Sequence, residues 1–452
     1  MILPESFPAI KTFTRHLAAI PSLLLLVRCL GGFLDHRGRM SATQAAGAIR
    51  TAPCHRANVG RYLGRLGRRR DWQLLEQLAD QLLGLESRCG TWVLLLDSTY
   101  VGQSGAKTEN TFSRANYRPR PKRSNRYQKK GPRRSCHAFV MALLLTPSGY
   151  RIPLGRCYHT QSYALAKGLT YRTQAELAAE LIRQAPIPVG AKTIVIADTA
   201  FDAQVIRSAC EQRSYSWIVP VNPERVLAGP KGQRPKIRSL VASLQAKDFQ
   251  AVRLDPGCGE ARRHRRLSRY RVGPKVKRRT YHVHGEHFNI HSVGTVLVVF
   301  SAMETPQAKV GVGVQKILMT NDRSLTAAAV VELYDRRWQI ELFFKELKST
   351  LGFARYSFRH FEKVQGWTQV CLVAFVYLEW RRARQLRRGR LSGPQRRVWE
   401  SQRSFGGVQA VRQWAEVYEL KKLRDWLATP SGCKKLSRLL RAAKTPEYQV
   451  SA

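Results

Sequence analysis

Short apolar runs that alternate with amphipathic segments constrain the fold of this chain most strongly. Trp92–Leu96 and Thr193–Ala197 are almost wholly apolar, and each run is followed by an aspartate. Gln174–Gln184 and Ala203–Gln212 instead carry apolar residues at helical spacing. Strands that are apolar on both faces need helices on both sides of their sheet. The pattern therefore predicts a mixed α/β fold.

Changes in composition divide the chain into five regions. We expect a helical region at 1–89 and the first part of the α/β core at 90–221. Residues 222–318 are rich in Gly, Pro and Arg and interrupt the alternation, which predicts a β-rich insertion. The core then resumes at 319–388 with a long helix at about 325–351 and another at 360–388. The last region, 389–452, is basic and predicted to be helical.

The charge of the chain points to a polyanionic partner. Its 77 Lys and Arg residues outnumber 31 Asp and Glu residues and give a net charge of +46. Such an imbalance favours nucleic acid well ahead of an acidic membrane. The longest apolar run, Val370–Leu378, is much shorter than the roughly 20 residues of a membrane span. The nine cysteines contain no CxxC pair, so we expect reduced thiols and a soluble, cytosolic protein.

One predicted helix, Leu333–Leu351, concentrates polar residues along a single line. At 100° per residue, four of them fall within an arc of about 60° beside the apolar stripe: Tyr334, Arg337, Glu341 and Lys348. A carboxylate at that border can be directed into a cleft, with basic groups beside it. The alternative is a surface ion pair between Arg337 and Glu341, four residues apart.

Two further carboxylates bear on that choice. Asp97 and Asp198 each follow an apolar strand, and the carboxyl ends of strands are where ligands gather in α/β sheets. Either could instead be a turn or cap residue. Together with Glu341 they could form a cluster that hard divalent cations neutralise. Two such metal ions can promote attack on a phosphodiester.

These residues resemble bacterial insertion-sequence transposases of the DDE type, in the branch with a Y-x2-R-x3-E-x6-K signature. The helical line matches that spacing in full: Tyr334, Arg337, Glu341 and Lys348. Asp97-Ser98-Thr99 resembles the first motif of the family. Asp198-Thr199-Ala200-Phe201 resembles the second motif. The resemblance covers roughly residues 90–380.

The resemblance implies an RNase H-like mixed sheet flanked by helices, with the β-rich insertion placed before Glu341. It implies that Asp97, Asp198 and Glu341 are catalytic and hold two Mg²⁺ ions, with Mn²⁺ able to substitute. Activated water would nick the transposon end, and the freed 3′-hydroxyl would attack target DNA directly or after a hairpin intermediate. The implied function is cut-and-paste DNA transposition.

DNA contacts are also implied by the resemblance. Tyr334, Arg337 and Lys348 would hold terminal phosphates. Trp338 would stack on a flipped base, although packing in the core is an alternative. Residues 1–89 are expected to be a DNA-binding region. The partner of the protein would be double-stranded DNA, both the terminal inverted repeats of the transposon and the target, and a homodimer would pair two ends. The protein would act in the bacterial cytoplasm, associated with the nucleoid and with no membrane partner.

A basic segment follows the first aspartate motif. Residues 107–134 contain eleven Lys and Arg residues and one acid. We expect this segment to contact the DNA backbone through a group of basic residues: Arg118, Arg120, Lys122, Arg123, Arg126, Lys129 and Lys130. Residues 262–279 contain ten Lys and Arg residues and no acid, and the same interpretation applies to them.

Other interpretations stay open at this point. Ser41–Ile49 and Arg56–Leu66 could form a helix-turn-helix, although a helical pair with basic solvated faces is favoured. Four histidines could suggest zinc, but their spacing matches no standard zinc module: His282, His284, His287 and His291. A DNA-binding protein that has lost catalysis, or a metal-dependent nuclease that cuts without joining, are the alternative functions.

Overall fold

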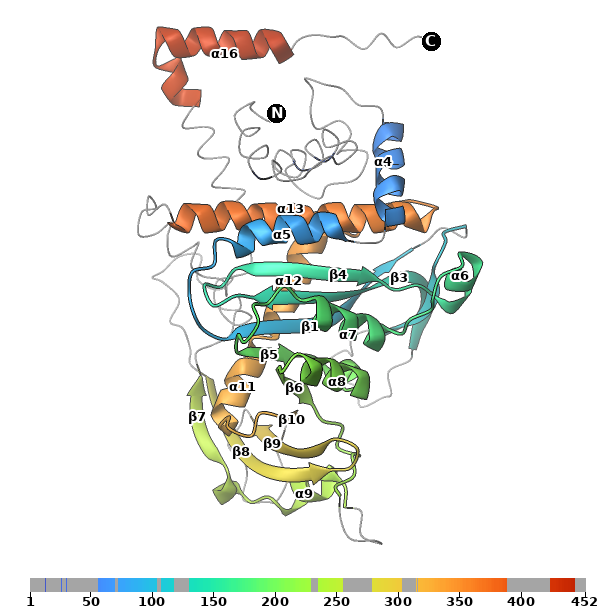
Figure 1. The fold of residues 1–452 in the computed structure, drawn as a ribbon, viewed down its shortest axis with the longest axis vertical. Helices are drawn as coiled ribbons and strands as arrows, with labels where there is room; N and C mark the ends of the chain where they lie inside the picture. The colour runs from blue at the N-terminus through green and yellow to red at the C-terminus, as the bar shows by residue number, and fades with distance from the viewer. Residues whose placement is uncertain are drawn as a thin grey trace.

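The computed structural model describes most of the α/β region and parts of the flanking segments (Figure 1). The described residues are 56–69, 72–103, 107–117, 130–228, 235–254, 279–302, 316–387 and 423–443, with Phe13, Leu26, Leu30 and Val314 as isolated additions. Within them the fold is a large mixed sheet with helices on both faces, as the sequence predicts.

Five strands form the centre of the sheet in the order β4-β3-β1-β5-β6. Their bounds are β1 Trp92–Gly102, β3 Lys130–Leu145, β4 Arg151–Cys157, β5 Thr193–Ile196 and β6 Ser216–Pro220. The strands β4, β3 and β1 pair antiparallel, while β1, β5 and β6 pair parallel. The short β2, Phe112–Tyr117, pairs with the first part of β3. This arrangement is consistent with the RNase H-like fold that we predicted.

The strands of the expected insertion extend this sheet. They are β7 Gln250–Leu254, β8 Arg279–Ile290, β9 Gly294–Ala302 and β10 Lys316–Thr320. They form an antiparallel series, and β10 also pairs antiparallel with β6. The helix α9, Ile237–Ser243, lies beside them. The insertion therefore joins the core through backbone hydrogen bonds, which should hold the two parts in a fixed relation.

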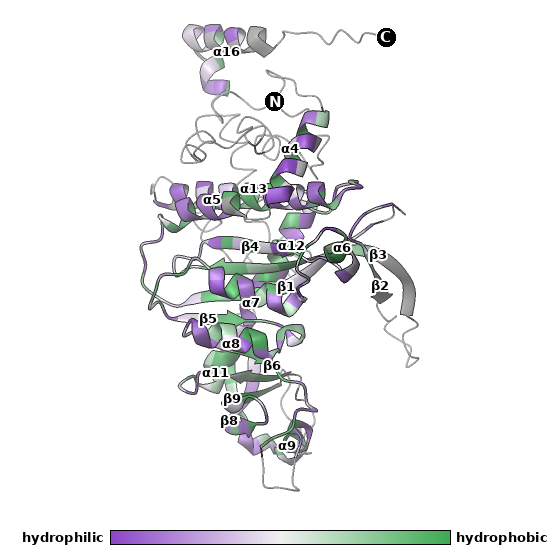
Figure 2. Cartoon of the chain, turned by 45° about the vertical axis from the view of Figure 1, so that its right-hand side comes forward, coloured by the Kyte–Doolittle hydropathy of each residue, from purple (hydrophilic) through white to green (hydrophobic). Residues whose placement is uncertain are grey.

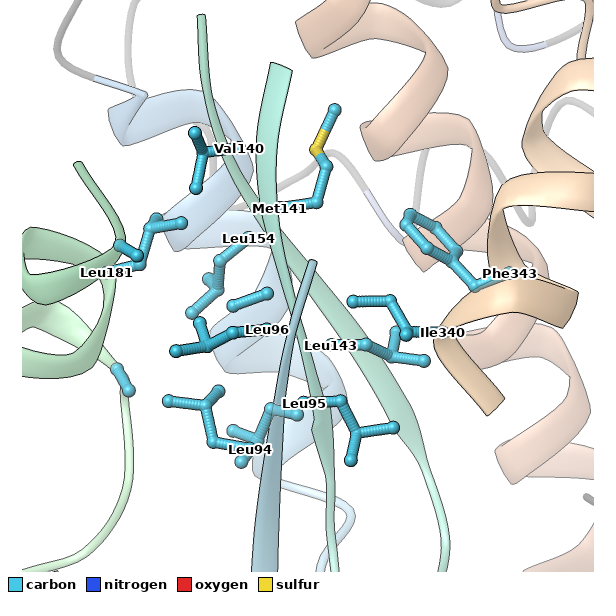
Figure 3. Packing of buried hydrophobic residues seen from close by; sticks show 14 of the residues in the cluster. Leu94, Leu95, Leu96, Val140, Met141, Leu143, Leu154, Leu181, Ile340 and Phe343 are labelled. Carbon is cyan, nitrogen blue, oxygen red and sulfur yellow. The ribbon is translucent and has the colours of Figure 1, made fainter. Parts of the chain in front are cut away.

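Helices cover both faces of the central strands. On one face lie α7, Gln174–Gln184, and α8, Gln204–Gln212, and on the other lie α12, Trp338–Ser349, and α13, Phe361–Arg387. Figure 3 shows Leu96 of β1 directed toward Leu181 of α7, whereas Leu143 of β3 is directed toward Ile340 of α12. Because side chains alternate along a strand, Leu95 and Asp97 share the face that α12 covers.

The predicted helix at about 325–351 is two helices. They are α11, Ala327–Asp335, and α12, and Arg336 and Arg337 form a turn between them. The Arg337 N–H donates to the Tyr334 carbonyl oxygen (2.9 Å), and the Ile340 N–H donates to that of Arg337 (3.1 Å). These i to i+3 hydrogen bonds wind the chain more tightly, so residues before and after the turn are no longer related by the 100° per residue of a continuous α-helix. The prediction of one uninterrupted helix is therefore wrong at this point.

The helix α13 explains the longest apolar run of the chain. Every residue of Val370–Leu378 is buried, and the helix contacts the sheet at β4 as well as two N-terminal helices, α4 Arg56–Arg69 and α5 Gln73–Leu83. A helix that is apolar all round needs such cover on every side. No helix in the part of the chain that the structure describes is long and apolar enough to cross a membrane.

The contact between α4 and α13 depends on two glycines. A Cβ atom at Gly366 would lie 2.0 Å from the Leu63 carbonyl oxygen, and one at Gly67 would lie 1.8 Å from that of Glu362. The backbones of α4 and α13 therefore approach so closely that only glycine fits at these two positions.

We predict that Gly366→Ala destabilises the protein by about 1–3 kcal/mol, because overpacking forces the backbones apart. Gly60→Ala on α4 is the matched control, since nothing lies within 4 Å of its Cβ position. It should be neutral or slightly stabilising, because alanine is the better helix former. Urea denaturation followed by circular dichroism compares the two. Equal stability of both variants would contradict the tight crossing.

Candidate active site

The three carboxylates predicted to be catalytic come from three separate elements. Asp97 lies in β1, Glu341 lies in the first turn of α12, and Asp198 caps the short 3₁₀ helix Thr199–Phe201 that follows β5. Leu95 pairs with Ile196 across the parallel strands β1 and β5. Each aspartate lies two residues beyond that pair, so the two lie at the same level and on the same face. Asp198 follows the end of β5, as predicted, whereas β1 continues to Gly102, so the predicted strand end at Asp97 is wrong.

The charges of two of the carboxylates act on the third, Asp97. The pKa of Asp97 is raised to about 6, first by burial, then by the charge of Asp198 and, more weakly, by that of Glu341. The Ser98 N–H, which donates to the Asp97 carboxylate (2.7 Å), and the charge of Arg337 oppose this shift. Burial and nearby like charges both disfavour the ionised form of a carboxyl group, so the raised pKa of Asp97 reflects a buried position close to two other acids.

Arg337 lies between two of the carboxylates. Its guanidinium group is 2.5 Å from a Glu341 oxygen and 3.8 Å from an Asp97 oxygen. The ion pair between Arg337 and Glu341 that we considered as the alternative does exist. It is not only a surface pair, because the same guanidinium reaches Asp97 in the strand and its side chain is only 17% exposed.

Lys348 and Tyr334 flank this group. The Lys348 ammonium donates to the Tyr100 carbonyl oxygen on β1 (3.1 Å), and burial lowers its pKa while the charge of Asp97 raises it. Tyr334 is buried, and burial raises its pKa to about 12. Its phenol is therefore a neutral hydrogen-bond donor at ordinary pH.

Two basic residues near the site were not singled out by sequence motifs. The Lys316 ammonium on β10 lies 4.4 Å from the centre of the Tyr334 ring, and the charges of Arg337 and Glu341 both act on its pKa, which burial lowers. Arg114 on β2 stacks on the Tyr100 ring at 3.5 Å, and its charge lowers the pKa of Lys348. Arg114 belongs to the basic segment 107–134 and could have been found from it. Nothing in the sequence around Lys316 marks it, because the pairing of β10 with β6 is what brings it to the site.

Trp338 opens α12 and is 42% exposed. This exposure does not fit the alternative that it packs in the core. An exposed indole close in sequence to Arg337 and Glu341 offers a surface on which a flat ring can stack.

A buried cluster of charges fixes α12, the helix of Glu341, against the rest of the core. The Arg151 guanidinium of β4 lies 3.1 Å from Glu346 of α12 and 2.6 Å from Glu379 of α13. Arg382 of α13 lies 2.8 Å from Glu379 and donates to the Gly149 carbonyl oxygen (3.0 Å). All four side chains are at most 3% exposed. The cluster therefore ties one strand and two helices together in the interior.

Several predicted residues lie outside the described part of the chain. Arg118, Arg120, Lys122, Arg123, Arg126 and Lys129 belong to this group, as do Ser41–Ile49 and most of residues 262–279. Lys130 is the first residue of β3, but its side chain is not described. The expected DNA contacts of these residues stay predictions.

The carboxylates fit a hard divalent cation in chemistry, since they offer only oxygen ligands. In the conformation described, no group of three or more His, Cys, Asp or Glu side chains among the described residues is arranged to hold a metal ion. The histidines do not gather either: His284 bonds to the Asp248 carbonyl oxygen, and His287 to that of Arg323. Zinc binding by the histidines thus finds no support in the described region.

Comparison with protein families agrees with this geometry. Residues 88–377 match the family model described as the transposase DDE domain. The chain belongs to this DDE transposase family. The matched region begins just before β1, ends within α13 and contains all three carboxylates. A search of curated proteins finds no match to this DDE transposase.

Proposed function

We propose that the protein is a transposase that cleaves DNA at transposon ends and transfers the strands into target DNA. The observation that carries the proposal is the effect of the Asp198 and Glu341 charges on Asp97, although the three residues come from distant parts of the chain. Three acidic residues on one face of an RNase H-like sheet have no structural need to approach one another, but metal-dependent phosphoryl chemistry requires it.

We propose Asp97, Asp198 and Glu341 as the ligands of two Mg²⁺ ions, with Mn²⁺ as a substitute. The bound metals would supply activation of the attacking oxygen and stabilisation of the leaving oxygen. Arg337 neutralises Asp97 and Glu341 in the present conformation, so its guanidinium must move aside to let the carboxylates converge. It then becomes available to pair with a phosphate. Tyr334 is a neutral phenol with a high pKa, which suits it to donate a hydrogen bond and not to act as a nucleophile.

The proposal for the branch within the family is supported by four residues that keep the Y-x2-R-x3-E-x6-K spacing: Tyr334, Arg337, Glu341 and Lys348. We assign the protein to bacterial insertion-sequence transposases on this basis. We also propose that a homodimer pairs two terminal inverted repeats in the cytoplasm. Base stacking on Trp338 would contribute about 1–3 kcal/mol to the hold on a flipped base.

We predict that Arg337→Ala and Lys348→Ala reduce strand joining more than they reduce nonspecific DNA binding. Each removes a cation from the place where a terminal phosphate would lie, while the many other basic residues sustain nonspecific binding. A joining assay with pre-cleaved ends, run beside a filter-binding assay on unrelated duplex, separates the two effects. Unchanged joining would show that these residues do not hold the phosphate.

One experiment discriminates the three candidate functions. The purified protein is incubated with Mg²⁺, a plasmid target and a DNA fragment that carries the inverted repeats flanking its own gene. Cleaved ends joined to the plasmid support the transposase. Cleavage without joining indicates a nuclease, and binding without cleavage indicates a DNA-binding protein that has lost catalysis.

A further inference from the structure

A basic groove lies between α4 and the start of α13, apart from the three carboxylates. It encloses about 740 Å³, and its described lining includes five basic residues and one acid. The basic residues are Arg61, Arg65, Arg68, His360 and Lys363, and the acid is Glu362. Figure 1 shows α4 crossing α13 at this end, on the side of α13 that faces away from the sheet.

The two faces of α4 explain why the groove is basic. Val59, Tyr62, Leu63 and Leu66 are buried, and they hold the helix against the core. Arg61, Arg65 and Arg68 follow the spacing i, i+4, i+7 and are all exposed, and the sequence of α4 contains no acid. Figure 2 shows this mixture of hydrophilic and hydrophobic residues along the helix. The basic stripe therefore lacks a carboxylate from its own helix to offset it.

The dimensions of the stripe suit a nucleic-acid backbone. Seven residues of helix rise about 10 Å, and duplex DNA carries one phosphate per strand for about every 3.4 Å of its axis. Three guanidinium groups over that length can each meet a phosphate, and Lys363 of α13 lines the same groove.

We propose that this groove binds the sugar–phosphate backbone of double-stranded DNA at a place separate from the catalytic carboxylates. This inference rests on the proposed function and extends it by naming a surface that holds the substrate. The wall formed by α13 belongs to the helix that also contributes Glu379 and Arg382 to the buried charge cluster with α12. DNA in the groove is thus held in a fixed relation to Glu341.

A substitution at Glu362 should change the affinity for DNA in the opposite direction to a substitution of the arginines. Its carboxylate lies 3.5 Å from Arg68 and 3.9 Å from Lys167, and it is the one acid in the described lining of the groove. Glu362→Gln keeps the shape of the side chain and removes a charge that repels phosphate. We expect this variant to bind DNA more tightly, and weaker binding would contradict the proposal that DNA binds in the groove.

The decisive test compares two triple variants with equal charge. Arg61→Gln, Arg65→Gln and Arg68→Gln are combined in one protein, and Arg183→Gln, Arg238→Gln and Lys247→Gln in the control, whose three residues are exposed elsewhere. The affinity for a duplex of unrelated sequence is measured at several KCl concentrations. The slope of log affinity against log salt should fall by about 0.9 for each phosphate that the protein no longer neutralises, up to about 2.7 for three.

The control should keep the slope of the unmodified protein, and equal thermal melting of all three proteins would confirm that they are folded. The proposal that DNA binds in the groove would be overturned if the salt slope of the groove variant is unchanged, or if the control lowers the slope equally. Tighter binding to phosphatidylserine vesicles than to duplex DNA would overturn it as well. The assay needs no cleavage, so absence of cleavage by the unmodified protein would refute the proposed function and leave a difference in slope standing.

Discussion

Replacing Asp97 by asparagine should lower Mg²⁺-dependent cleavage of transposon-end DNA by at least about 10³-fold. A metal ion contributes several kcal/mol to the stabilisation of a transition state of this kind, and each 1.36 kcal/mol is a factor of about ten in rate. The same effect is expected for Asp198→Asn and Glu341→Gln. End binding should stay largely intact, because basic residues far outnumber acids and supply most of the attraction to DNA.

A matched control uses an aspartate outside the site. Asp80 is an exposed residue of α5, and Asp80→Asn makes the same chemical change on a helix that holds none of the three carboxylates. This variant should cleave at the unmodified rate. Full cleavage by any of the three active-site variants would remove that residue from the proposed metal site.

Replacing Arg151 by methionine should destabilise the fold by about 3–5 kcal/mol, which is the usual effect of removing one member of a buried ion pair. Glu346 would then lack the guanidinium partner that lies 3.1 Å away, and Glu379 would keep Arg382. Since Glu346 belongs to the same helix as Glu341, the helix should also shift from its place beside β1. Chemical denaturation gives the change in the free energy of unfolding.

Arg172→Met provides the control for this effect. Arg172 pairs with Glu180, but its side chain is 51% exposed. Exposed pairs contribute about 0–1 kcal/mol, so the change should be small. Equal destabilisation by Arg151→Met and Arg172→Met would contradict the view that the buried cluster fixes α12.

The central strands could be predicted from the sequence because their signals are local. The apolar runs at Trp92–Leu96 and Thr193–Ala197 form strands in the structure. The aspartates that follow them lie at the same level, Asp97 within β1 and Asp198 just after β5. The hairpin between β3 and β4 is also local, because a short turn that contains Pro147 and Gly149 joins the two strands. In each case neighbouring residues carry the information, and the parallel pairing of β1 and β5 then aligns the two aspartates.

Other features depend on partners that are distant in the sequence. Arg151 and Glu346 are 195 residues apart, and each looks like an ordinary surface charge in its own segment. Lys316 reaches the site only because β10 pairs with β6. The break at Arg336 and Arg337 escaped prediction because apolar periodicity continues across it while the hydrogen bonds tighten. The convergence of the carboxylates on metal ions stays a prediction, as do the contacts of residues 118–129.

The most direct test of the account is a crystal structure of the protein with transposon-end DNA and Mn²⁺, with metal positions located by anomalous diffraction. We predict two Mn²⁺ ions about 3.5–4 Å apart, bound by Asp97, Asp198 and Glu341, with Arg337 turned away from Asp97. The absence of metal between these residues, or carboxylates separated by more than about 10 Å in an ordered subunit, would contradict the central claim.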